Sequence, residues 1–186
     1  MDCASHAFIG AGVGELGRRH WSRRQVVGWC AFFGILPDVL SNWFLYPYLG
    51  WLKGRDWLIP RNEDWIGFRE SNPWLSATWE ATHSLVFVAV VILPVVRYFR
   101  LPRACSLAYL SHVLADIVTH SGEWSATPLW PLPWRVEGWA DAWRWDSPAL
   151  LLSVLASAAF WLGCRGWASV APVHRMLGGW RRWMGR

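Results

Sequence analysis

Residues 25–47 read QVVGWCAFFGILPDVLSNWFLYP, an apolar run long enough to cross the hydrocarbon core of a bilayer, which takes about 20 helical residues. The run carries one acid, Asp38, directly after Pro37. A carboxylate inside such a helix is costly in lipid, so Asp38 is expected to face other helices and to have a partner there. The stretch therefore predicts a membrane-spanning helix that belongs to a bundle.

Four further apolar stretches bounded by charges, Gly or Pro are expected to be helical: residues 3–17, 82–99, 104–120 and 148–165. The composition agrees with a membrane protein, because 54% of the 186 residues are hydrophobic and only 17% are charged. The sequence thus predicts an all-α integral membrane helical bundle of about five membrane helices, formed by residues 1–186 as a single domain. A bundle of four membrane helices, with the first stretch lying on the inner surface, stays open as an alternative.

The charges are sorted by membrane side when all five stretches cross with the amino terminus outside. The inner segments then hold twelve of the 18 basic residues and no acids: Arg18, Arg19, Arg23, Arg24, Arg97, Arg100, Arg103, Arg165, Arg175, Arg181, Arg182 and Arg186. Basic residues are known to concentrate on the cytoplasmic side, so the protein is expected to be a multi-pass membrane protein with these segments on the cytoplasmic side. Membrane sorting also explains the net charge of +5, and no nucleic-acid partner is expected.

Two local patterns invite a functional interpretation but have a simpler one. Residues 12–17 match GxGxxG, but they follow no strand, so the glycines, with the GxxxG from Gly10 to Gly14, are interpreted as helix-packing positions. Many of the 18 Trp residues end apolar runs and are interpreted as an aromatic belt. The Pro-rich segment 127–134 is expected to cap the outer mouth, and the Trp-rich stretch up to Trp145 to anchor in headgroups or to form a lip for a lipid-like substrate.

Polar residues inside the apolar stretches are predicted to meet at one depth. Counted from the nearest inner arginine at about 1.5 Å per residue, His6, Asp38, His83 and Asp116 all lie roughly 18–21 Å into the membrane. His112 and His120 share the helix face of Asp116, about one turn below and one turn above it. The coincidence in depth requires the first stretch to cross, and it therefore favours five spans.

This set of side chains predicts a metal site. Imidazole nitrogens and carboxylate oxygens are good ligands for zinc or a similar divalent ion, and a cation would neutralise carboxylates that lipid disfavours. The expected ligands are His6, Asp38, His83, His112, Asp116 and His120. His6 or His83 taken alone is more simply a hydrogen-bonded core residue, and His120, where helix meets loop, has a position outside the ligand set or facing solvent as its alternative. Glu80, one turn before His83, is a candidate general base, although an exposed carboxylate at the loop edge is the simpler interpretation.

The order of these short motifs resembles a bacterial family of inner-membrane metal-dependent hydrolases, some of them LexA-regulated. The resemblance rests on Ser5-His6, Leu36-Pro37-Asp38, Thr82-His83-Ser84, Ser111-His112 with Asp116-Ile-Val-Thr119, and Pro128-Leu-Trp-Pro131. It implies His6, Asp38, His83, His112 and Asp116 as metal residues, and a remote likeness to zinc-dependent phospholipase C implies phosphoester chemistry. The long Trp-rich segment 48–81 departs from the family pattern.

The expected function is therefore membrane-bound hydrolysis that depends on a divalent metal, with zinc as the expected cofactor. The substrate would be an ester or phosphoester of a membrane lipid or lipid-linked molecule, with Asp116 or Glu80 as the catalytic carboxylate. Two alternatives stay open at this point. The His/Asp cluster could relay protons or carry an ion without any enzymatic activity, or the metal could be purely structural.

Overall fold

The computed structural model describes the backbone of residues 2–17 and 21–184, and the side chains of these ranges except at residues 62, 143 and 171–184. Arg18, Arg19 and Arg186 of the charge tally lie outside the described residues. The described chain is helical, with no strand and one isolated bridge between Ala126 and Val136. Its main elements are α1 (Cys3–Leu16), α2 (Arg23–Leu52), α3 (Phe68–Ser71), α4 (Pro73–Thr82), α5 (Leu85–Phe87), a π-helical turn (Val88–Ile92), α6 (Leu93–Tyr98), α7 (Ala104–Thr119) and α8 (Ser147–Met184).

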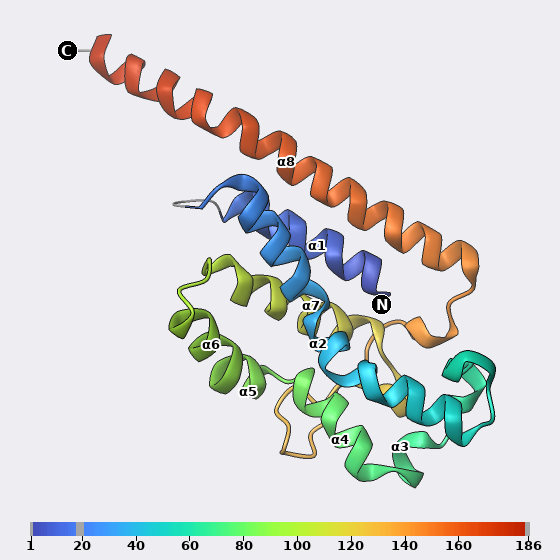
Figure 1. Ribbon diagram of the computed structural model, residues 1–186. Helices are drawn as coiled ribbons and strands as arrows, with labels where there is room; N and C mark the ends of the chain where they lie inside the picture. The colour runs from blue at the N-terminus through green and yellow to red at the C-terminus, as the bar shows by residue number, and fades with distance from the viewer. Residues whose placement is uncertain (1, 18–20, 185–186) are drawn as a thin grey trace.

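Helix α1 lies inside the bundle, where α2, α7 and α8 pack around it (Figure 1). Its glycines allow this packing: a Cβ at Gly10 would meet the backbone of Cys30, and one at Gly12 would meet the Phe160 ring. The residues matching GxGxxG therefore serve helix packing, as the sequence predicts. Because α1 touches all three neighbours, it can deliver a side chain to the bundle interior.

Helix α2 is longer than predicted, because it continues past Pro47 to Leu52. At its start Ser22 forms a capping box with Gln25 and satisfies the free N–H groups of the first turn. The expected end at residue 47 was wrong. A proline is tolerated inside a membrane helix when neighbouring structure supports the backbone, and the end of α2 packs against the segment 56–58.

The predicted helix 82–99 is broken at its start. Helix α4 ends at Thr82, and the axis turns by 57° before the helix that runs from Leu85 to Tyr98. The Ser84 hydroxyl accepts from the Phe87 N–H and caps α5, while the Leu85 N–H donates to the Pro128 carbonyl at 2.8 Å. The Pro-rich segment thus supports the break in the helix, and its expected place as a cap of the outer mouth stays a prediction.

The segment between α2 and α4 contributes a second small core. Trp65, Phe68, Trp79 and Trp124 pack together with Leu45, and each is at most 6% exposed. These three tryptophans are interior residues, so the aromatic-belt interpretation is wrong for them. Other tryptophans remain available to the headgroup region, because they are highly exposed: Trp43, Trp51, Trp57, Trp74, Trp139 and Trp167.

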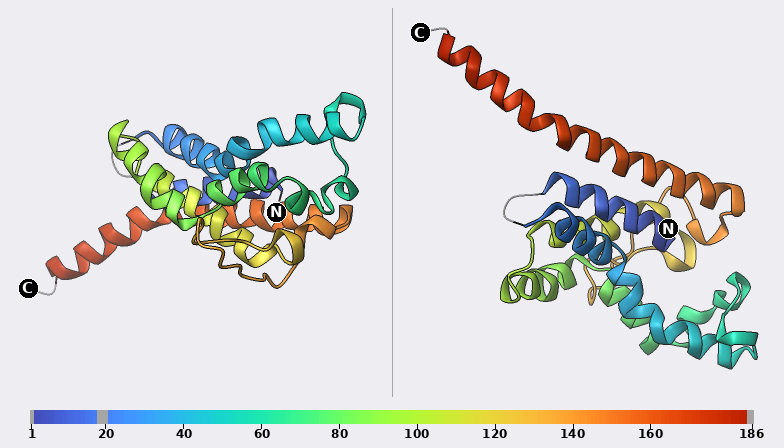
Figure 2. Two further views of the ribbon diagram at one scale, coloured as in Figure 1. Left: turned by 90° about the horizontal axis from the view of Figure 1, so that it is seen from below. Right: turned by 45° about the horizontal axis from the view of Figure 1, so that its top comes forward.

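The two ends of the bundle differ in what they hold. One end carries the end of α1, the start of α2 and the α6–α7 connection, and the other carries the amino terminus, the outer loops and the start of α8 (Figures 1 and 2). Helix α2 and residues 147–170 of α8 are long and apolar enough to cross a membrane, and the bent pair α4 and α5–α6 can count as a third span. The chain is therefore a helical membrane bundle with two or three spans by these criteria.

Candidate metal centre

Helix α7 supplies His112 and Asp116 on one face. One turn separates them, and the His112 Nε2 lies 3.1 Å from the Asp116 Oδ2. The His112 Nδ1 lies 2.6 Å from the carbonyl of Gly34, in the turn of α2 that precedes Pro37. A carbonyl can only accept a hydrogen bond, so the Nδ1 of His112 carries a proton. When the ring is neutral, its Nε2 then has a free lone pair.

The break between α4 and α5 positions His83 in the same way. His83 ends α4, stacks on the Trp79 ring with centroids 4.6 Å apart, and lies with its Nδ1 2.8 Å from the Trp79 carbonyl. This contact fixes Nδ1 as the donor and leaves Nε2 as a lone pair. That nitrogen lies 3.5 Å from the Asp38 Oδ1 and 3.6 Å from the Asp116 Oδ2. Histidine ligands of metals commonly donate their second N–H to a backbone carbonyl in this manner.

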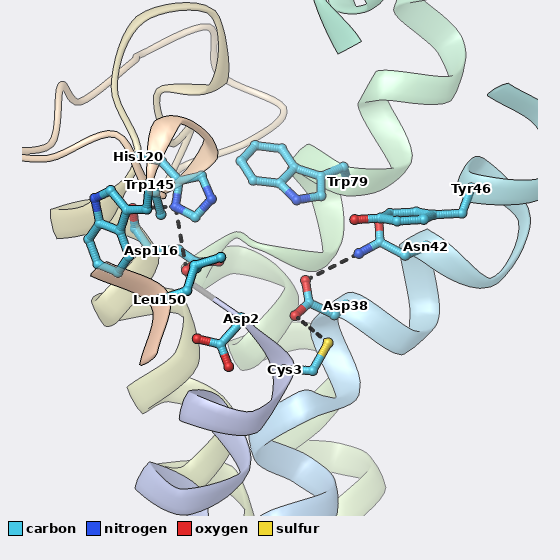
Figure 3. A pocket seen from close by; sticks show the side chains of 11 residues that line it. Asp2, Cys3, Asp38, Asn42, Tyr46, Trp79, Asp116, His120, Trp145 and Leu150 are labelled. Atoms are coloured by element: carbon cyan, nitrogen blue, oxygen red, sulfur yellow. Dashed lines mark hydrogen bonds and ion pairs between the residues drawn. The ribbon is translucent and has the colours of Figure 1, made fainter. Parts of the chain in front are cut away.

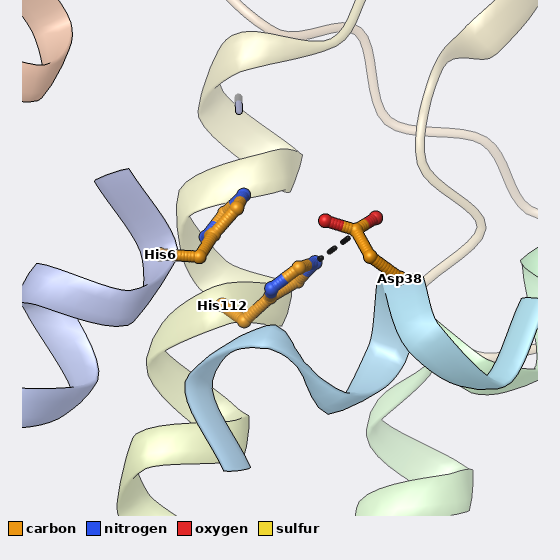
Figure 4. A group of neighbouring side chains, drawn as sticks. All are labelled: His6, Asp38 and His112. Atoms are coloured by element: carbon orange, nitrogen blue, oxygen red, sulfur yellow. Dashed lines mark ion pairs between the residues drawn. The ribbon is translucent and has the colours of Figure 1, made fainter. Parts of the chain in front are cut away.

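His6 and Asp38 complete the cluster from α1 and α2 (Figure 4). The His6 ring stacks on His112 with centroids 3.6 Å apart, and its Nε2 lies 3.2 Å from the Asp116 Oδ1. The Asp38 Oδ1 faces the Nε2 of His112 at 3.9 Å, while its Oδ2 faces the Cys3 thiol. Four helical elements that are distant in sequence therefore bring their polar groups together, at the common level that the depth argument predicts.

Four of these atoms form a compact set of possible donors: His83 Nε2, His112 Nε2, Asp38 Oδ1 and Asp116 Oδ2. The distances between nitrogen and oxygen atoms within the set run from 3.1 to 3.9 Å. Ligands held tetrahedrally at about 2.0–2.1 Å from zinc are roughly 3.3 Å apart. The four nitrogen–oxygen distances bracket that spacing, and the donor atoms of each of two overlapping groups, His83–His112–Asp116 and His6–Asp38–His112, lie within 4.8 Å of one another.

The buried nitrogens of this cluster lack hydrogen-bond partners. His6 Nδ1 and Nε2, His83 Nε2 and His112 Nε2 are all shielded from solvent and make no hydrogen bond within the described part of the chain. Lone pairs of imidazole and carboxylate that face each other repel unless a proton or a metal cation lies between them. The same contacts form ion pairs when the rings are protonated, so the donor set fits either protonated imidazoles or a bound divalent metal.

His120 differs from its prediction in its backbone. Helix α7 ends at Thr119 and His120 is extended, so His120 does not continue the helix face of Asp116. Its ring nevertheless folds back, with Nδ1 3.4 Å from the Asp116 Oδ1 and 3.2 Å from the Asp116 carbonyl. His120 thus stands beside the second oxygen of Asp116, outside the four-donor set.

A cavity of about 250 Å³ opens on the cluster from the end that carries the amino terminus (Figure 3). Of the cluster, Asp38, Asp116 and His120 line the cavity, whereas His6, His83 and His112 do not. Its remaining lining comes from Asp2, Cys3, Asn42, Tyr46, Trp79, Ala142, Trp145 and Leu150. The sequence partly predicted this lining, because it offered the Trp-rich stretch up to Trp145 as a lip for a substrate. It gave no indication that Cys3, Asn42 or Tyr46 would line the cavity.

Glu80 is engaged elsewhere. Its Oε1 lies 2.6 Å from a guanidinium nitrogen of Arg69, which is 5% exposed and also donates to the carbonyls of Glu123 and Ser125. This arrangement ties α3 and α4 to the segment that follows His120. Glu80 does not line the cavity, so the geometry favours a supporting position, and its role as a general base stays a prediction.

The fold and the cluster together define a class: a multi-helix membrane protein with a buried, multi-helix set of histidine and aspartate side chains. The family model described as "YdjM inner membrane protein" matches residues 1–183. The chain therefore belongs to this family, and it is a bacterial inner-membrane protein. No match was found among the curated proteins or among the solved structures. The bacterial inner-membrane family expected from the motifs is confirmed in this general form.

Proposed function

We propose that this protein holds a divalent metal, expected to be zinc, and hydrolyses an ester or phosphoester of a lipid or lipid-linked substrate. The observation that carries the proposal is the set of buried imidazole nitrogens without hydrogen bonds, which face two carboxylates at 3.1 to 3.9 Å. The ligands would be His83, His112, Asp38 and Asp116. Nitrogen and oxygen donors without a thiolate suit zinc and similar divalent ions.

His6 and His120 would act around the second oxygen of Asp116. Asp116 offers Oδ2 to the four-donor set and Oδ1 to His6 and His120, at 3.2 and 3.4 Å. A divalent ion held in the four-donor set would lower the pKa of a water molecule and polarise the substrate oxygen. Asp116, which lines the cavity, would take the proton, and His120, which also lines it, would pass that proton toward solvent.

The cavity supports a substrate with a small polar head and an apolar body. Its polar lining comes from Asp2, Asn42 and Tyr46, and its apolar wall comes from Trp145 and Leu150 at the start of α8. About 250 Å³ accommodates a headgroup but not a whole lipid, so the acyl chains would stay in the bilayer beside α8. This geometry is the reason for preferring a lipid or lipid-linked substrate.

Five crossings are also part of the proposal, with α1 and α7 as short helices packed among longer ones. His6 reaches the cluster only because α1 runs back from the loop end of the bundle alongside α2. Cys3 offers a direct test, because it is the one exposed cysteine among Cys3, Cys30, Cys105 and Cys164. An impermeant maleimide applied to intact spheroplasts should label wild type but not Cys3→Ser. Labelling that requires permeabilised membranes would favour four spans.

Metal content tests the centre itself. The detergent-purified protein should retain stoichiometric metal, and His112→Ala and Asp116→Ala should lose most of it. Asp141→Ala is a matched control, because Asp141 pairs with Arg144 on the loop surface and should leave the metal in place. Absence of metal from wild type would contradict the proposal and favour a proton relay.

Hydrolysis is tested separately with phospholipid and lipid-linked phosphoester substrates in mixed micelles. Activity should disappear with chelator, return with zinc and be lost in Asp116→Ala. Metal that stabilises the fold without any turnover would instead identify a structural site. Glu80→Gln distinguishes a general base from a residue that stabilises α4. If Glu80 is a general base, kcat should fall with an unchanged unfolding temperature. If Glu80 stabilises α4, the unfolding temperature should fall.

A further inference from the structure

A second cavity lies at the opposite end of the bundle from the metal centre. About 730 Å³ in volume, it is formed where α6 ends and α7 begins, close to the α6–α7 connection seen in Figure 1. Thirteen residues of α7 separate Arg103 from Asp116, roughly 20 Å along the helix. We call this site the arginine pocket, and its lining residues are Leu93, Val96, Arg97, Arg100, Leu101, Arg103, Ser106 and Leu107.

The three arginines of the pocket have no counter-charge within the part of the chain that the structure describes. None of Arg97, Arg100 and Arg103 makes an ion pair with a described residue, and no described lining residue is acidic. Glu15, an acid at the same end of the bundle, is buried and already bound to Arg23 at 2.6 Å. Three arginines that line one hollow without an acid beside them are available to bind an anion through charge-assisted hydrogen bonds.

Arg100 occupies a backbone position that favours glycine. Its φ of 54° is left-handed, and the Leu101 N–H donates to the Val96 carbonyl at 2.9 Å, which closes the end of α6. Glycine ends a helix in this way without strain, whereas an arginine is strained. Helix termination therefore does not explain an arginine at this position, and what Arg100 shares with Arg97 and Arg103 is a positive charge on the lining of one hollow.

Apart from Ser106, the rest of the pocket lining is apolar, and two of its leucines face outward. Leu93 is 50% exposed and Leu107 is 57% exposed, so the hollow has an exposed apolar surface next to its arginines. A soluble phosphate would gain no binding free energy from this apolar surface. The glycerol and first acyl carbons of a phospholipid would bury it. Arginine-rich hollows between membrane helices on the cytoplasmic side suit anionic lipid headgroups.

We propose that the arginine pocket binds the phosphate of an anionic phospholipid, such as phosphatidylglycerol, in the leaflet at this end of the bundle. The bound lipid would fill the gap between α6 and α7 and hold their connection in place. This site is independent of the metal centre, since it shares no residue with it.

Native mass spectrometry from a detergent that contains equal amounts of phosphatidylglycerol and phosphatidylcholine tests the proposal. Wild type should prefer phosphatidylglycerol, by on the order of 100-fold if each arginine contributes about five-fold. Gln at positions 97, 100 and 103 together should abolish the preference, and Arg100→Gln alone should reduce it about five-fold. The single variant keeps the test valid if the triple variant fails to fold.

The control is a variant with the same loss of charge at the other end, Arg61→Gln with Arg135→Gln and Arg144→Gln, all at exposed loop positions. It should keep the wild-type preference. An equal loss in both triple variants would mean a general charge effect and would overturn the proposal. Millimolar glycerol phosphate should not displace the lipid, and displacement would show a site for soluble phosphates instead.

Discussion

Replacing Gly10 by alanine tests how α1 is placed against α2. A Cβ at Gly10 would meet the Cys30 carbonyl oxygen and would lie 3.1 Å from the Gly34 Cα. Both are backbone atoms, so the helices must separate. Overpacking of this kind costs about 1–3 kcal/mol. For a chain of this size each kcal/mol lowers the unfolding temperature by about 2–4 °C, so we expect Gly10→Ala to lower it by roughly 2–12 °C.

Gly28→Ala is the matched control for this measurement. Gly28 lies on α2 with nothing within 4 Å of a built Cβ, so alanine there should be neutral or stabilise the helix by about 0.5–1 kcal/mol. Thermal unfolding in detergent, followed by circular dichroism, compares the two variants. Metal content should fall in Gly10→Ala alone, because His6 lies one turn before Gly10. Equal unfolding temperatures for the two variants would refute the close α1–α2 crossing.

Two further predictions concern single contacts. The Tyr109 hydroxyl donates to the Thr82 carbonyl at 2.7 Å in the fully buried core, so Tyr109→Phe should cost about 1–3 kcal/mol in thermal unfolding, whereas Tyr98→Phe at an 80% exposed position should cost nothing. Hydrogen bonds from Arg55 lower the pKa of Asp64 from 3.8 to about 2, so the stability they give the outer loop is complete above about pH 4 and is lost as pH falls through 2. Pepsin cleavage of residues 53–67 should rise over that window, and Asp64→Asn should remove the dependence on pH.

Periodicity and composition were enough to predict the positions of the helices that are apolar throughout. The stretch 104–120 ends within one residue of α7, and 25–47 lies wholly inside α2. The prediction failed where polar chemistry sets the boundary. Ser84 caps α5 and breaks the predicted helix 82–99, and Pro73 begins α4 inside a segment interpreted as a loop. Both residue types are standard start signals, but the apolar pattern around them concealed the break.

The candidate site was predictable in its membership but not in its detail. Counting residues from the inner arginines placed His6, Asp38, His83 and Asp116 at one level because helical rise is constant. The tautomer of each histidine depends on the backbone carbonyl that its ring contacts. For His112 this is the carbonyl of Gly34 on another helix, and the sequence does not reveal such contacts. Glu80 illustrates the same limit, because its partner Arg69 lies in a segment that carried no helical signal.

X-ray absorption at the zinc edge of the purified protein is the most direct test of the metal centre. We expect only nitrogen and oxygen scatterers at about 2.0–2.2 Å, four from the protein and one from water, with the outer-shell signature of two imidazoles from His83 and His112. That signature should weaken in His112→Ala. A sulfur shell at about 2.3 Å, or a spectrum indistinguishable from zinc in buffer, would contradict a site built from these histidines and aspartates.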